Sequence, residues 1–292
     1  MRILQIDKFF YKCEGSSRVY FDTIDGLRAR GQEVAEFSMQ HPKNKRSAFS
    51  RYFAPTAPEL NDNLNKFEKL KVMFRRYFSG EVERRLGALI SDFRPDVAHI
   101  HNSSWCLSAG ILRTLHDLRV PTVLTMQEVP LPCLDLFQKF EAYYYRWRGS
   151  WKNIRLFICR SEFVANKLVE NEFPKEKIRL VRNPYLLPEH VTPPDVKVAN
   201  TEEEILAALS EGKIVVAAHG GGNSEIIIDG ENGFIYRADD PGNLVATVAR
   251  AKALPGDKVN RIVERGRQLV LRDHNPDQYF RQLMGVYEEA IK

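Results

Sequence analysis

The strongest pattern in this chain of 292 residues is the alternation of short apolar runs with longer amphipathic stretches. Runs of four or five residues rich in Val, Ile and Leu are typical of buried strands, whereas an apolar residue every three or four positions predicts a helix. Because helical stretches separate most of the runs, their order predicts βαβ units in a doubly wound parallel sheet with right-handed crossovers. The predicted strands occupy residues 2–6, 33–37, 96–100, 121–125, 155–159 and 177–181.

The helices between these strands carry recognisable end signals. A first helix places Phe21, Ile24 and Leu27 on one face and ends at Gly31, since glycine readily adopts the positive φ of a helix C-terminus. Another helix begins after Ser161, a good N-cap residue. A long helix follows a polar, Pro-containing loop and buries a stripe formed by Leu70, Phe74, Phe78, Val82, Leu86 and Leu89.

After residue 184 the chain becomes rich in proline and loses its periodicity. Residues 185–200 therefore predict a linker between an N-terminal domain over 1–184 and a smaller C-terminal part over 201–292. The smaller part shows a helix over 202–210 and later three helical segments.

Only two strands are predicted in the C-terminal part, over 213–217 and 233–236. Two strands bury too little surface to stand alone. We therefore expect them to find partners, either in a rearranged sheet or across a homodimer.

Three consecutive glycines follow the first of these two strands, and a candidate binding loop over Gly220, Gly221, Gly222 and Asn223 results. Glycines at the carboxyl end of a buried strand let the backbone approach a ligand, and N–H groups at a helix start attract anions. The alternative is a turn that needs glycine only for its positive φ.

The composition describes a globular protein, with 43% hydrophobic and 28% charged residues. No apolar run reaches the roughly eighteen residues of a membrane span, and the apolar start is broken at Asp7, so we expect neither a transmembrane helix nor a signal peptide. The cysteines show no metal-ligand spacing and predict reduced thiols in a cytoplasmic protein. They are Cys13, Cys106, Cys133 and Cys159.

Basic residues alternate with aromatic ones in three segments, over 43–51, 66–78 and 143–155, although the net charge is only +5. Such segments are typical of solvated helix faces, and an anionic membrane surface or a nucleic acid are the alternatives. Because no nucleic-acid motif accompanies them, we expect no nucleic-acid partner. Peripheral contact with the inner membrane surface stays open.

Several polar residues fall at the carboxyl ends of the predicted strands, where open α/β sheets bind ligands. Gly15 and Arg18 lie in the first strand-to-helix loop, and His101 and Asn102 follow the strand over 96–100. We expect these four residues to line a cleft. A simple turn with a surface arginine, and a structural hydrogen-bonding role for His101, are the alternatives, and His99 on the same strand face is expected to be packed.

Gln127 and Glu128 end the neighbouring strand over 121–125. Glu128 is the candidate acid or base at this rim, and Gln127 can hydrogen-bond a substrate hydroxyl but cannot titrate. Lys8 and Lys12 reach the same rim or are solvated.

The segments RPDVAHIHN, VPTVLTMQE, ICRSEFVANKL and VRNP, and the later stretch SEGKIVVAAHGGGNSEIIIDGENGFIYRADDP, resemble family 4 of the GT-B glycosyltransferases in order and spacing. The resemblance implies two Rossmann-like domains, the first for the acceptor and the second for a nucleotide-sugar donor such as a UDP- or GDP-hexose. It further implies retaining transfer to a saccharide or lipid-linked acceptor without a metal or other cofactor, as in polysaccharide biosynthesis. The donor-binding residues it implies are Gly220, Gly221, Gly222, Asn223 and Glu225.

The chain departs from the family pattern in three places. The front half of the donor domain is absent before Glu202, which makes the C-terminal part a truncated remnant of a GT-B architecture. The family's paired donor-site glutamates fall on Ala199 and Ala207, and its His-Asp pair falls on Gln127 and Glu128. The nearby acidic run at Glu202 predicts the solvated first turn of a helix.

Two hypotheses follow from these departures. The first is a glycosyltransferase whose activity is weak or lost, since the leaving diphosphate needs fixed cations and dipoles. The second is a non-catalytic relative that binds a glycan or acceptor, or serves as a scaffold. Titration with UDP and GDP separates the two.

Overall fold

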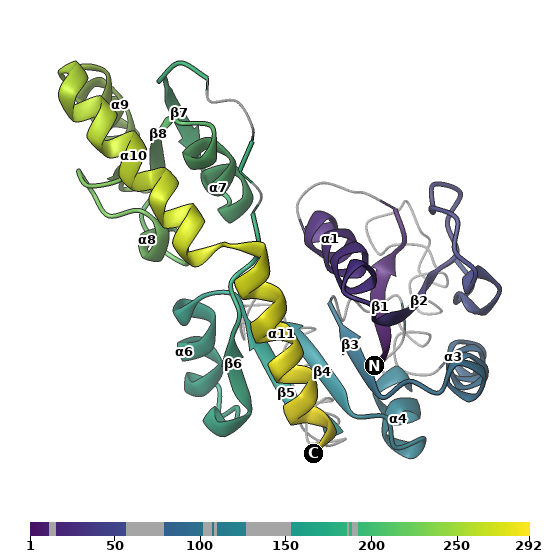
Figure 1. Cartoon of the computed structure of the whole chain (residues 1–292). Helices are drawn as coiled ribbons and strands as arrows, with labels where there is room; N and C mark the ends of the chain where they lie inside the picture. The colour runs from purple at the N-terminus through teal and green to yellow at the C-terminus, as the bar shows by residue number, and fades with distance from the viewer. Residues whose placement is uncertain are drawn as a thin grey trace, which may run out of the picture. The chain divides into compact units, whose positions relative to one another are not determined.

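The computed structural model describes residues 1–11, 16–56, 79–101, 107, 110–126, 153–185, 187–188 and 192–292 (Figure 1). The chain forms two compact units. The first unit contains Met1–Cys159, Phe173–Arg179 and Met284–Lys292, and the second contains Arg160–Glu172 and Leu180–Leu283. The C-terminal helix α11 (Pro276–Ile291) therefore begins in the second unit and ends in the first.

The larger sheet confirms the predicted α/β fold. Its six strands follow the order β2-β1-β3-β4-β5-β6. The pairs β1–β2, β1–β3, β3–β4 and β4–β5 are parallel. Every strand predicted in the first 181 residues is present, within one to three residues at each end. The strands are β1 (Arg2–Phe9), β2 (Glu33–Met39), β3 (Val97–Ile100), β4 (Thr122–Met126), β5 (Leu156–Cys159) and β6 (Ile178–Leu180).

The helices of the first unit also follow the predicted apolar stripes. They are α1 (Ser16–Ala29), α3 (Gly80–Phe93) and α4 (Gly110–Asp117). Val82, Leu86 and Leu89 of α3 are fully buried, as the stripe predicts. The N-terminal half of that stripe, Leu70 to Phe78, lies outside the described residues.

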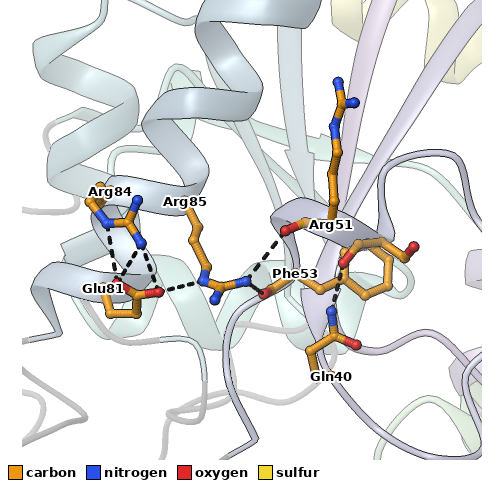
Figure 2. A network of polar contacts seen from close by, with 7 residues as sticks. Gln40, Arg51, Phe53, Glu81, Arg84 and Arg85 are labelled. Carbon is orange, nitrogen blue, oxygen red and sulfur yellow. Dashed lines mark hydrogen bonds and ion pairs between the residues drawn. The ribbon is translucent and has the colours of Figure 1, made fainter.

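The described residues that follow β2, up to residue 56, are anchored by a side chain of α3 (Figure 2). Arg85 Nη1 donates hydrogen bonds to the carbonyl oxygens of Arg51 at 3.3 Å and Phe53 at 3.0 Å. Its Nε donates to Glu81 at 2.6 Å, so the carboxylate holds the guanidinium in place. Directly after β2, Gln40 Nε2 donates a hydrogen bond to the carbonyl oxygen of residue 50 at 2.6 Å.

The second unit contains a smaller sheet of three strands in the order β7-β8-β9, all parallel. Its strands are β7 (Val196–Ala199), β8 (Ile214–Ala218) and β9 (Phe234–Tyr236). Its complete helices are α6 (Glu162–Glu170), α7 (Glu202–Ser210), α8 (Asn223–Ile226), α9 (Pro241–Lys252) and α10 (Gly256–Asp273).

β8 is buried on both faces, as a central parallel strand should be. Val215 and Ala217 pack in one apolar cluster with residues of α7, whereas Ile214 and Val216 pack in a second cluster with Ala251 of α9. The expectation of a rearranged sheet is confirmed, because β8 finds both of its partners within the chain.

Strand β7 was missed from the sequence. It occupies residues 196–199, near the end of the segment 185–200 that the sequence pattern predicts as a linker. The alternation Val-Lys-Val-Ala is short and follows Pro193 and Pro194, so the local sequence does not predict a strand. Pairing with β8 stabilises the extended conformation instead.

Within the described parts of the chain, no helix is long and apolar enough to cross a membrane.

Candidate functional site

The carboxyl end of β1 is irregular in a way that is common beside functional sites. The pairing of β1 with β2 shifts register after Ile6, so that Phe9 lies opposite Met39. Asp7 lies in this bulge, and its Oδ1 accepts a hydrogen bond of 2.6 Å from the N–H of Lys8. β-bulges re-aim side chains at such positions.

Asp7 is only 7% exposed. Burial raises the pKa of Asp7 to about 7, although the hydrogen bond and the charge of Lys8 act in the opposite direction. A carboxylate with such a perturbed pKa at a strand's carboxyl end is a functional candidate. From the sequence, Asp7 counts only against a signal peptide, although its place directly after the first predicted strand is a signal for a functional residue.

His99 and His101 lie inside the first unit and belong to a chain of hydrogen bonds. His101 Nε2 donates to Gln5 Oε1, and Gln5 Nε2 donates to the hydroxyl oxygen of Tyr287 at 3.1 Å. His99 Nδ1 is hydrogen-bonded to the Tyr287 hydroxyl at 2.7 Å, and His99 Nε2 is hydrogen-bonded to Thr125 Oγ1 at 2.7 Å. Four elements, β1, α11, β3 and β4, are thereby linked.

The two histidine rings share one face of β3, as predicted, with centroids 3.9 Å apart. Burial lowers the pKa of His101 to about 3. Burial, and then the neighbouring His101, lower the pKa of His99 well below its usual range. Both rings are therefore neutral at physiological pH, which fits the hydrogen-bonding role left open for His101.

The remaining residues expected at this rim are placed as follows. Arg18 lies on α1 with a side chain 47% exposed, and its Nε is 3.4 Å from Asp22 Oδ2. The other four lie outside the described residues: Gly15, Asn102, Gln127 and Glu128.

The glycine loop follows β8 directly, at the carboxyl edge of the smaller sheet. Gly220 and Gly221 have φ of +119° and +57°, so the turn itself requires glycine at both positions. Gly222 has an ordinary φ of −69°, and a Cβ there would lie 3.5 Å from Ser161 Cβ. The turn reading therefore holds for Gly220 and Gly221, and Gly222 lies close to Ser161, the N-cap residue of α6. Binding of a ligand by this loop stays a prediction.

The N–H groups of this loop are only partly used by the protein. The N–H of Gly220 donates to Ser224 Oγ at 3.0 Å, and Asn223 Nδ2 donates to the carbonyl of Ala218 at 3.3 Å. Within the described residues, the N–H groups of Gly221 and Gly222 have no acceptor. The helix that follows, α8, has only four residues, so its contribution to anion attraction is small.

Glu225, which the resemblance implies as donor-binding, caps α6 instead of standing free. Its two oxygens accept hydrogen bonds from the N–H groups of Glu162 at 2.8 Å and Phe163 at 2.5 Å. Ser161 Oγ accepts from the N–H of Val164 at 3.3 Å, as its predicted N-cap role requires. A carboxylate from the glycine loop thus takes the place at the N-terminus of α6 that a bound anion could occupy.

A cluster of charged groups joins the first turn of α7, which follows β7, to Arg160, which follows β5. Arg160 Nη1 lies 3.4 Å from Glu203 Oε1 and 3.7 Å from Glu202 Oε2, and all three side chains are largely buried. Glu202 Oε1 is buried without a hydrogen-bond partner among the described residues. Burial raises the pKa of Glu202 to about 7 and outweighs the charge of Arg160.

The prediction of a solvated acidic turn is therefore wrong for Glu202. It is right for Glu204, which is exposed and completes a capping box with Thr201. Sequence reasoning also missed Arg160, although it directly follows the predicted strand over 155–159 and directly precedes an N-cap serine. The contact between Arg160 and Glu202 joins residues more than forty positions apart, which no local pattern reveals.

Ala199 is fully buried in the apolar cluster that includes residues of α7. Across the described ranges, no group of three His, Cys, Asp or Glu side chains is gathered as a metal site requires.

Two α/β units, each with a parallel sheet, form the architecture of the GT-B fold. The profile of the family described as Glycosyltransferase Family 4 matches residues 14–185, more than half of the chain. The chain belongs to this family.

Solved structures agree on the fold. A glycosyltransferase from Rickettsia africae superposes with a TM-score of 0.73 at 13% identity, covering 100% of this chain and 98% of that one. Sucrose-phosphate synthase from Thermosynechococcus elongatus gives 0.70 at 14% identity, with 99% and 98% covered. Anabaena HepE in complex with UDP and glucose gives 0.69 at 12% identity, with 99% of both chains covered. No curated protein matches the sequence.

Proposed function

We propose that this protein transfers a hexose from a nucleotide sugar, such as a UDP- or GDP-hexose, to a saccharide or lipid-linked acceptor. The transfer is retaining and needs no metal, and Glu128 and Gln127 serve the reacting centre. The donor binds at the carboxyl edge of the β7-β8-β9 sheet, and the acceptor binds at the carboxyl edge of the larger sheet.

The observation that carries the donor site is the pair of N–H groups on Gly221 and Gly222 that have no acceptor within the described residues. They lie on a partly exposed loop at the end of a buried parallel strand, where this class of fold binds nucleotides. Fixed N–H dipoles of this kind stabilise negative charge that develops on a leaving diphosphate.

Arg160 and Glu202 supply further groups at this edge. The guanidinium of Arg160 provides a fixed positive charge, which the front half of a donor domain would otherwise supply. Because its pKa is about 7, Glu202 is partly protonated near neutral pH and offers both a donor and an acceptor to a sugar hydroxyl. The UDP complex of Anabaena HepE supports a uridine nucleotide as the first donor to try.

The test is calorimetric titration of the whole chain with UDP and with GDP, followed by an assay of nucleotide release from UDP-glucose in the presence of EDTA. We expect one of the two nucleotides to bind and its release to continue without divalent metal. Absence of binding by both nucleotides at millimolar concentration overturns the donor site.

A second candidate is a non-catalytic glycan-binding or scaffold relative. It is favoured by Ala199 and Ala207, which cannot hydrogen-bond a ribose or sugar, and by Glu225, whose carboxylate is used to cap α6. Binding of an oligosaccharide by a chain that shows no binding of UDP or GDP would establish this alternative.

A further inference from the structure

Three aromatic rings gather where β1 and β2 end, and we call Phe9, Tyr11 and His41 the aromatic platform. The rings of Tyr11 and His41 stack with centroids 4.5 Å apart at an interplanar angle of 27°. Phe9 joins them, with its ring centroid 4.9 Å from that of Tyr11 and 5.5 Å from that of His41. All three side chains are only partly buried, so the platform has an accessible face.

The platform is held in place by the chain around it. The side chain of Asn44 accepts from the N–H of Phe10 at 3.2 Å and donates to the carbonyl of Met39 at 2.8 Å. The N–H of Lys45 donates to the carbonyl of Phe10 at 2.8 Å. The loop after β2 is thereby fixed to the end of β1, and its side chains need little further ordering to bind a ligand.

His41 also has a defined hydrogen-bonding state. The backbone N–H of Lys43 donates to its Nδ1 at 3.1 Å. The neutral ring therefore carries its proton on Nε2, where it can donate to a ligand that lies against the platform.

Lysine side chains surround the platform. The ammonium of Lys8 lies 4.5 Å from the ring centroid of Phe9, and that of Lys43 lies 5.9 Å from the centroid of Tyr11. Lys45, whose ammonium lies 3.9 Å from the ring centroid of Phe21, and Arg46 follow in the same loop. There is no Asp or Glu anywhere between residues 37 and 58. Among the described residues, no ion pair engages Lys43, Lys45 or Arg46.

We propose that the aromatic platform and its lysines bind an acidic saccharide, which is the acceptor of the transfer described above. The C–H face of a sugar ring packs on the negatively polarised faces of the aromatic rings. A carboxylate or phosphate on the sugar then pairs with the ammonium groups of Lys8, Lys43 and Lys45. This assignment of the acceptor class rests on the proposed function.

The same observations disfavour the other partners considered for this basic segment. A membrane-binding surface presents large apolar side chains for insertion, yet the described large apolar residues that are strongly exposed lie on other segments. A duplex nucleic acid calls for a longer array of cations than this short loop provides.

The experiment uses the whole chain and calorimetric titration with three oligosaccharides of equal length. Two are acidic, an oligogalacturonate and a heparin fragment, and one is the neutral maltohexaose. We expect an acidic oligosaccharide to bind at least about tenfold more tightly than maltohexaose, and its affinity to fall as NaCl rises from about 50 to 300 mM.

Two variants locate the binding. Replacing Lys43→Gln together with Lys45→Gln weakens the acidic oligosaccharide by about tenfold and leaves maltohexaose unchanged, whereas Tyr11→Leu weakens both. The matched control, Lys252→Gln with Lys258→Gln, removes two exposed charges from the second unit and has no effect.

Equal affinity for acidic and neutral oligosaccharides, or no binding of either acidic one, overturns the proposal. So does tighter binding to vesicles of anionic phospholipid or to a single-stranded oligonucleotide in the same buffer. Titration with UDP is carried out on every variant. Loss of acidic saccharide binding with UDP binding retained supports the platform, whereas a wild-type chain that binds no nucleotide defeats the donor site alone.

Discussion

The two sheets of this protein end in different ways at their carboxyl edges. In the first unit, His99, His101, Gln5 and Tyr287 satisfy one another through hydrogen bonds between uncharged groups. In the second unit, the corresponding edge holds charged side chains around Arg160 and a glycine loop with unused N–H groups.

The polar groups of the first unit therefore form part of its core, whereas those of the second unit are suited to bind a ligand. Uncharged groups that are fully paired add rigidity and offer nothing to a ligand. Buried charges with an unsatisfied oxygen, as at Glu202, cost stability, and proteins retain such costs mostly at functional sites. We therefore expect ligand binding at the second edge and, in the first unit, at Asp7 and the surface around it.

Asp7→Asn tests the buried ionisable group at the edge of the first sheet, and it has the largest expected effect on stability. In the folded state the Asp7 carboxyl group keeps its proton up to about pH 7, whereas an unfolded aspartate loses its proton near pH 3.8. The stability that the protonated carboxyl group contributes at low pH is therefore lost as the pH rises from 3.8 through 7. The variant should be more stable than the wild type at about pH 8, by up to roughly 4 kcal/mol, with the difference shrinking towards pH 4. Urea unfolding at both pH values measures it.

The control for this prediction is Asp22→Asn, at an exposed carboxylate on α1. It should change stability by less than about 0.5 kcal/mol. If Asp7→Asn destabilises the chain at pH 8, the aspartate is ionised and well solvated, contrary to its burial.

Glu202→Gln makes the same test on the second edge. Because burial raises the pKa of Glu202 to about 7, the stability contributed by its protonated form is lost as the pH rises from 4.5 through 7. The variant should gain up to roughly 3 kcal/mol at about pH 8. Glu204→Gln in the same helical turn should not gain, since backbone hydrogen bonds from residues 200 and 201 lower the pKa of Glu204. Equal gains in the two variants would contradict the assignment.

Tyr287→Phe breaks the uncharged network of the first unit. It leaves Gln5 and His99 without their shared hydroxyl group, and a buried polar group without a partner costs about 1–3 kcal/mol. Tyr236→Phe in the second unit is the control, because its hydroxyl contacts Asn200 in an exposed setting. Denaturant unfolding should show a clear loss for the first variant and almost none for the second.

Gly221→Val has the smallest expected effect and bears most directly on function. A branched side chain covers the approach to the free N–H groups, and nucleotide affinity should fall by about tenfold. Gly230→Val is closely matched, since Gly221 and Gly230 have φ of +57° and +75° and neither has a neighbour within 4 Å of an added Cβ. Both variants suffer similar backbone strain, so an equal loss of nucleotide affinity would show that the loop only shapes the turn.

Much of the architecture follows from the sequence pattern, because local signals decide it. The boundaries of α7 agree with the sequence prediction, and β8 and β9 agree within one residue, since a capping residue or a glycine turn delimits each of them. Strand β7 has no such signal, and its pairing with β8 is what makes it a strand.

The candidate sites were less predictable, because they depend on contacts between distant residues. The glycine loop was found from its own sequence, but the capping of α6 by Glu225 was not, since the two are more than sixty residues apart. The burial of Glu202 likewise depends on Arg160, and the neutral state of His101 depends on its place inside the sheet.

The hydrogen bonds of Tyr287 have a consequence for the order in which the protein can fold during synthesis. Gln5 and His99 emerge from the ribosome long before residue 287 exists, although their buried polar groups depend on its hydroxyl. N-terminal domains generally begin to fold while translation continues. Here the interior of the first unit is incomplete until α11 has been synthesised and packs against it.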